Sequence, residues 1–144
     1  MINFQYSRAT DVADAVRQMA AHPSAKFIAG GTNLIDLMKE DVEHPSRLID
    51  IARLPLNSVE GTADGGVQIG ALVLNSDLAY HPLIALRYPM LASAILAGAS
   101  AQLRNMASTG GNLAHCVGDV TGPCVLEIDH DCPIACWIAR TMLG

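Results

Sequence analysis

The amino-acid sequence predicts an α+β fold, with a small parallel βαβ lobe followed by part of a second α+β lobe. Residues 1–55 alternate strand-like and helix-like segments around a Gly-Gly turn, the order found in parallel βαβ units. After Pro55, two short apolar segments flank a glycine-rich turn, which is typical of a β-hairpin. A chain of 144 residues is long enough for one compact binding unit, so we interpret the two lobes as its subdomains.

The first lobe, residues 1–55, is expected to place strands at residues 3–6, 26–29 and 47–51. Its first helix begins after Thr10, whose hydroxyl can cap it. That helix ends at His22-Pro23, because the residue before a proline is displaced from helical backbone angles. A second helix runs from residue 33 to about 39, after Gly30-Gly31. Strand, glycine turn, helix and strand in this order predict parallel pairing.

The second lobe, residues 56–115, begins with a predicted hairpin whose strands cover residues 56–60 and 67–72. Asn75 and Asp77 can cap a short helix that ends near His81-Pro82. Residues 88–99 are apolar on every side, which predicts a buried helix. Residues 116–144 form a divergent tail that contains all four cysteines.

The sharpest motif is the segment Phe27-Ile28-Ala29-Gly30-Gly31-Thr32-Asn33-Leu34. A strand leads into two glycines, which lack Cβ atoms and can present consecutive backbone N–H groups to an anion. Thr32 and Asn33 are suited to cap the following helix. A diphosphate fits this arrangement, and a tight turn without ligand is the alternative. The motif is neither a Walker A loop nor a GxGxxG fingerprint.

A second glycine motif lies at residues 104–112, where Ser108 and Thr109 precede Gly110-Gly111 and Asn112 follows. One such loop is weak evidence for a ligand. Two loops in a short chain favour two walls around one phosphate-bearing ligand, with ligand-free turns as the equal alternative.

Together these segments resemble a known family. KFIAGGTNL at 26–34 and RNMASTGGNLAH at 104–115 resemble the FAD-binding subunit of the xanthine dehydrogenase and aldehyde oxidoreductase family of molybdenum hydroxylases. LIDI at 48–51, VQIGALV at 67–73 and LAGASAQLRN at 96–105 fit as well, so the similarity runs from about residue 1 to 115. The resemblance implies the FAD-binding fold of the vanillyl-alcohol oxidase (PCMH) type, with FAD between the two lobes.

The resemblance also implies which residues hold FAD. The loop around the pyrophosphate would comprise Lys26, Phe27, Ile28, Ala29, Gly30, Gly31, Thr32, Asn33 and Leu34. From the second lobe, the cofactor would be lined by Ser108, Gly110, Gly111 and Asn112, with Asp119 where many members carry an acid near the flavin. No catalytic residue is implied, because the redox chemistry belongs to the isoalloxazine ring. Lys26 and Arg104 are the cations nearest to the motifs, and Arg104 is expected to be structural or close to phosphate.

The four cysteines Cys116, Cys124, Cys132 and Cys136 are enough for a [4Fe–4S] cluster or a zinc ion. The family members that this chain most resembles, bacterial aldehyde oxidoreductase FAD subunits, hold such a cluster in a cysteine-bearing insertion at about this place. Here the spacing is not a CxxC pair pattern, so free thiols are the favoured interpretation. Family members also continue well beyond this length, which implies a truncated chain.

By resemblance, the chain passes electrons from iron–sulfur centres through FAD to an acceptor, beside an iron–sulfur subunit and a molybdenum-cofactor subunit. The alternatives are a truncated non-catalytic remnant and a small cysteine-based metal-binding module. A net charge of −5 with scattered basic residues argues against nucleic-acid binding. The apolar runs are too short for a membrane span. No secretory signal is visible, so we expect a cytoplasmic protein, or a periplasmic one if a partner subunit carries the signal.

Overall fold

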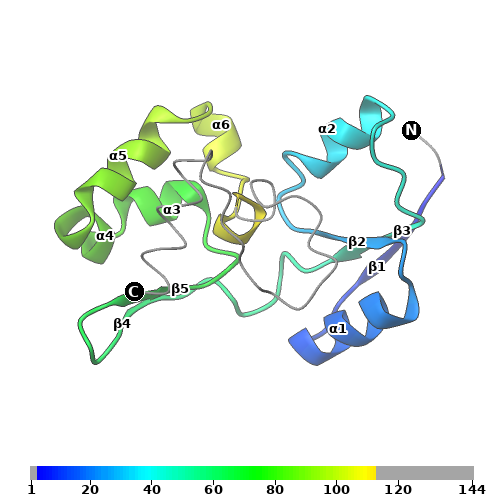
Figure 1. The fold of residues 1–144 in the computed structure, drawn as a ribbon, viewed down its shortest axis with the longest axis horizontal. Coiled ribbons are helices and arrows are strands. Elements are labelled where there is room, and N and C mark those ends of the chain that lie inside the picture. The colour runs from blue at the N-terminus through cyan, green and yellow to red at the C-terminus, as the bar shows by residue number, and fades with distance from the viewer. Residues whose placement is uncertain (1–2, 113–144) are drawn as a thin grey trace. The chain divides into compact units, whose positions relative to one another are not determined.

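The computed structural model describes residues 3–112 and divides the chain after Pro55 into two compact units, Met1–Pro55 and Leu56–Gly144 (Figure 1). The first unit contains a parallel sheet of three strands, and the second contains a two-stranded antiparallel sheet and short helices. This is the α+β architecture that the sequence predicts.

The first unit is built on a parallel sheet with the strand order β1-β3-β2. In chain order its elements are β1 (Gln5–Arg8), α1 (Val12–Ala21), β2 (Ala25–Ile28), α2 (Leu34–Lys39) and β3 (Arg47–Asp50). The connection from β1 to β2 passes the position of β3, and the connection from β2 to β3 runs back in the opposite direction. Because such crossovers share one hand, α1 and α2 are expected on opposite faces of the sheet. Figure 1 shows this arrangement, with α2 above the sheet and α1 below it.

The centre of this unit is β3, whose Leu48 and Ile49 are completely buried because helices cover both faces of the strand. Met38 of α2 is buried as well. Two predicted details of this unit are wrong. The first strand lies at 5–8 and not 3–6, in register with Arg47–Asp50. Asp11, not Thr10, caps α1, because its carboxylate accepts the Asp14 N–H at 2.7 Å and charged acceptors cap strongly.

The second unit opens with an antiparallel hairpin of β4 (Val59–Gly61) and β5 (Val67–Ile69). The ladder is shorter than predicted, but the backbones stay paired beyond it, since Gly70 donates to Ser58 and Leu72 donates to Leu56, each at 2.8 Å. This pairing brings the backbones so close that a Cβ on Gly70 would lie 2.2 Å from the Leu56 carbonyl oxygen. Only glycine fits at this position.

In the described part of the second unit, the hairpin is followed by the short helices α3 (Asn75–Tyr80), α4 (Pro82–Arg87), α5 (Pro89–Ala97) and α6 (Ala101–Arg104). Their core comprises Val67, Ile69, Val73, Leu78, Ala79, Ile84, Leu91, Ala92 and Ile95. The prediction that α5 is buried on every side is wrong, because Met90 is 72% exposed. Among residues 3–112 the longest helix has ten residues, so none of them is a candidate to cross a lipid bilayer.

Candidate functional site

The Gly30–Leu34 loop connects the carboxyl end of β2 to α2. The Ile51 N–H donates to the Ile28 carbonyl oxygen at 2.9 Å, which ties the start of the loop to the end of β3. Gly31 has φ +71°, and a Cβ there would lie 3.1 Å from Cγ1 of Ile35. The left-handed backbone therefore favours glycine at this position, and a Cβ would in addition require the Ile35 side chain to shift.

Backbone N–H groups in this loop are uncommitted. Among the described residues, no hydrogen-bond acceptor meets the amides of Gly30 to Leu34, whereas the carbonyl groups of Gly31 and Asn33 accept from α2 at 3.1 and 3.0 Å. The Asn33 side chain makes no capping hydrogen bond, so its predicted capping role is wrong. Five consecutive backbone N–H groups without an acceptor among the described residues can together bind an anion such as a diphosphate.

The second glycine loop has a different hydrogen-bond pattern. The amides of Thr109 and Gly110 donate to the Val73 and Ala71 carbonyl groups at 2.9 and 2.8 Å. Gly111 donates to the Ser108 hydroxyl at 3.3 Å, and Asn112 donates to the Ser108 carbonyl at 3.1 Å. Residues 109–112 are helical, with the Ser108 side chain at the start of the helix. These amides already have acceptors, so they are not free donors for a phosphate.

Packing also explains the side chains of this second loop. A Cβ on Gly110 would lie 2.9 Å from the Ala71 carbonyl oxygen, so glycine permits the close approach. Ser108 and Thr109 are buried, and Asn112 Nδ2 donates to Asn75 Oδ1 at 2.9 Å. These contacts tie the loop to the start of α3 and to the segment before it, which supports a structural role for the loop residues.

The two cations singled out by the sequence have protein partners. Lys26 Nζ lies 3.1 Å from Glu43 Oε1. Arg104 Nη1 donates to three carbonyl groups at the end of α5, those of Leu96, Gly98 and Ala99. Arg104 therefore has the structural role that the sequence left as one of two options.

A polar cluster that was not predicted from the sequence lies at the carboxyl ends of β1 and β3. Asp50 is 9% exposed, and its Oδ2 accepts from the Tyr6 hydroxyl at 2.5 Å and from Arg8 Nε at 2.9 Å. Its Oδ1 accepts from the Ala52 N–H at 2.9 Å. Burial raises the pKa of Asp50, but these three hydrogen bonds outweigh it and hold the pKa below its usual value. Only the strand register, which joins residues 42 positions apart, reveals this cluster.

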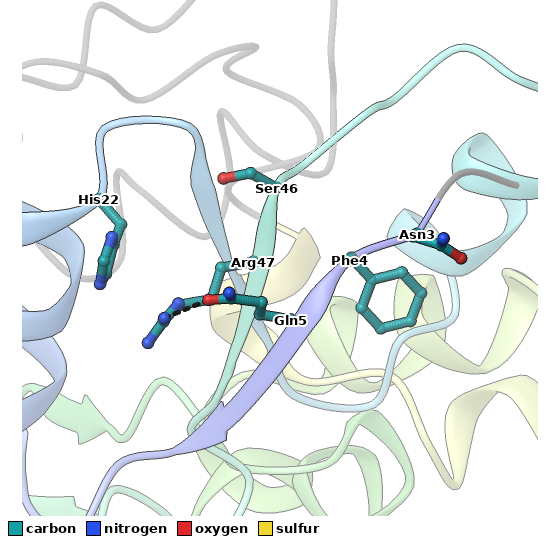
Figure 2. Close-up of a pocket in the computed structure, with 6 residues that line it drawn as sticks. All are labelled: Asn3, Phe4, Gln5, His22, Ser46 and Arg47. Carbon is teal, nitrogen blue, oxygen red and sulfur yellow. Dashed lines mark hydrogen bonds between the residues drawn. The ribbon is translucent and has the colours of Figure 1, made fainter.

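A cavity of about 540 Å³ lies at the opposite, amino-terminal edge of the same sheet (Figure 2). It is lined by Asn3, Phe4, Gln5, His22, Ser46 and Arg47. Arg47 donates to the Gln5 side chain, and its buried Nε has no acceptor among residues 3–112. Ligands of parallel sheets bind at the carboxyl ends of the strands, so this cavity is not the candidate for the diphosphate.

Several predicted site residues lie outside the described residues. These are Asp119 and the cysteines Cys116, Cys124, Cys132 and Cys136. Within residues 3–112 no group of three or more His, Cys, Asp or Glu side chains is placed to hold a metal ion.

Comparison with known proteins identifies the family. The family model described as "FAD binding domain in molybdopterin dehydrogenase" matches residues 2–129. The aldehyde oxidoreductase FAD-binding subunit PaoB of Escherichia coli is 53% identical over 110 residues, which cover 76% of this chain and 35% of that protein. The carbon monoxide dehydrogenase medium chain of Hydrogenophaga pseudoflava is 37% identical, over 78% of this chain and 39% of that one.

Solved structures agree with the sequence relatives. A structure of carbon monoxide dehydrogenase from Hydrogenophaga pseudoflava superposes with a TM-score of 0.76 and 36% identity, covering 81% of this chain and 42% of that one. Quinoline 2-oxidoreductase from Pseudomonas putida gives the same TM-score at 28% identity, covering 80% of this chain and 40% of that one. The chain thus spans about two fifths of the length of these relatives. It belongs to the family of FAD-binding domains of molybdopterin dehydrogenases.

Proposed function

We propose that the chain binds FAD with the pyrophosphate on the backbone amides of Gly30, Gly31, Thr32, Asn33 and Leu34. The observation that carries the proposal is the run of uncommitted N–H groups in this loop within the described part of the chain. The residues Lys26–Ala29 lead into the loop at the carboxyl edge of the sheet, the edge at which ligands of parallel sheets bind.

The second loop has a different role in this proposal. Its amides are engaged within the unit, so Gly110 and Gly111 would offer a surface without side chains to FAD and not phosphate donors. Ser108 and Asn112 hold that surface in place through their hydrogen bonds to Gly111 and Asn75. Asp119 stays a proposed flavin-side residue on the family resemblance alone.

The proposed role of the bound chain is electron transfer inside a larger complex. Relatives are named as a FAD-binding subunit and as medium chains of oxidoreductases, which supports partners for this chain as well. We place it beside an iron–sulfur subunit and a molybdenum-cofactor subunit, in the cytoplasm. Bound FAD supplies the chemistry that accepts electrons from iron–sulfur centres and delivers them to an acceptor. The protein contributes binding and position.

The experiment that tests the proposal is a titration of the full chain with FAD, followed by flavin fluorescence. ADP carries the diphosphate without the flavin, so we expect ADP to compete with FAD for the loop. Riboflavin lacks phosphate, so we expect it to compete far less well than ADP. If FAD binds and ADP does not compete, the diphosphate is not the group that the protein recognises and the proposed loop contact is wrong.

A further inference from the structure

The strand register aligns three residues in one row across the first sheet. Arg8 of β1 pairs with Asp50 of β3, and Asp50 pairs with Ile28 of β2. Register partners point to the same face of a sheet, and strands lie about 4.8 Å apart. Arg8 is therefore two strands, or about 10 Å, from the strand that leads into Gly30 and Gly31.

This row faces the side of the sheet that α2 covers. Lys26 lies two residues before Ile28, so it points to the same face, and it contacts Glu43, which follows α2. The Gly30–Leu34 loop passes from β2 to α2 and so turns toward this face as well. Arg8 and the loop consequently share one face and one edge of the sheet.

The Arg8 guanidinium reaches from the edge strand β1 to Asp50 of the central strand β3. Its Nε donates to Asp50 at 2.9 Å and its Nη2 donates to the Tyr6 hydroxyl at 3.1 Å. A guanidinium has five N–H donors, and the other three have no acceptor among the described residues. The Arg8 side chain is 44% exposed, so these donors are accessible.

Asp50 orients this cation. Its oxygens accept from Ala52, Tyr6 and Arg8, so the carboxylate is fixed in place and in turn fixes the guanidinium. The cations that the sequence motifs suggest have other partners: Lys26 pairs with Glu43, and Arg104 donates to carbonyl groups at the end of α5. Within residues 3–112, Arg8 combines an ordered position at this edge, set by its ion pair with Asp50, with N–H donors that have no acceptor.

We propose that Arg8 is a cofactor-binding residue that donates charge-assisted hydrogen bonds to the FAD diphosphate held by the Gly30–Leu34 loop. The inference rests on the proposed function of that loop. In this assignment Tyr6 and Asp50 are positioning residues, and Arg8 supplies positive charge to a loop whose other donors are neutral amides. Arginine suits the role, because its planar fork of donors matches phosphate oxygens.

The test compares Arg8→Gln with the parent chain in FAD and ADP titrations at low and high salt. Loss of a charge-assisted hydrogen bond is expected to weaken both ligands about tenfold. The parent's affinity should fall as salt rises, and the variant's should fall much less, because the screened charge is gone. Arg17→Gln is the matched control, since Arg17 lies on α1 with an exposed ion pair to Asp14, and it should bind both ligands as the parent does.

The outcomes separate the two proposals. If the parent chain binds FAD and the R8Q variant binds FAD and ADP as tightly as the parent does, the proposed role of Arg8 is overturned. The assignment of the loop is then unaffected. A folded parent chain without FAD affinity would overturn the loop itself. If R8Q does not fold, Arg8→Lys decides. A severalfold weaker ADP affinity with the salt dependence retained supports the proposal, and an unchanged ADP affinity overturns it.

Discussion

Replacing Gly31 with valine should weaken FAD binding by about tenfold or more. Gly31 has φ +71°, a left-handed conformation that costs a residue with a Cβ about 1–2 kcal/mol. The new Cβ would also lie 3.1 Å from Cγ1 of Ile35, so the Ile35 side chain or the loop must shift. A loss of 1.4 kcal/mol in binding corresponds to about a tenfold change in the dissociation constant.

The assay is a flavin fluorescence titration of parent and variant, with circular dichroism to establish that both are folded. Gly61→Val is a suitable control, because a Cβ at Gly61 meets nothing within 4 Å and valine is favoured in a strand. A folded Gly31→Val variant that binds FAD as tightly as the parent would refute the assignment of the pyrophosphate to this loop.

Two further predictions concern stability. Gly70→Ala places a Cβ 2.2 Å from the Leu56 carbonyl oxygen, so we expect about 1–3 kcal/mol of destabilisation in chemical denaturation, and an unchanged midpoint would contradict the close approach. Asp50 has a folded-state pKa below its unfolded value, so its contribution is present above about pH 4 and is lost as the pH falls through the folded pKa. Asp50→Asn should flatten the acid limb of the thermal-melting profile, while Asp36→Asn, which replaces an exposed side chain of α2, should leave it unchanged.

The sequence predicts features that depend on local spacing. The Gly30-Gly31 turn between β2 and α2 follows from a strand pattern, two glycines and a helix pattern, and the structure has all of them in that order. The end of α3 before Pro82 follows from the restriction that proline imposes on its predecessor. Both are properties of a few consecutive residues.

Features that depend on partners distant in the chain were not predictable. The Tyr6, Arg8 and Asp50 cluster requires the register between β1 and β3. Similarly, the sequence does not indicate that the Gly110 amide donates to the Ala71 carbonyl group. Because of this hydrogen bond, the second glycine loop lacks the free donors of the first, although the two sequences are alike.

Helix ends show the same limit at short range. Pro82 ends one helix by its effect on His81, but it also begins α4 at a position where its missing N–H costs nothing. The local sequence pattern predicts only the end of a helix at this proline. The second helix, α4, is stabilised by the packing of Ile84 into the core.

Binding of the FAD diphosphate by the amides of Gly30 to Leu34 is tested most directly by amide NMR of the isotope-labelled full chain. On addition of ADP, we expect the largest chemical-shift changes at the amides of residues 30–34. The amides of Thr109 and Gly110, which already donate to Val73 and Ala71, should change little. Saturable ADP binding with the largest changes elsewhere, and unchanged amides at 30–34, would contradict this assignment.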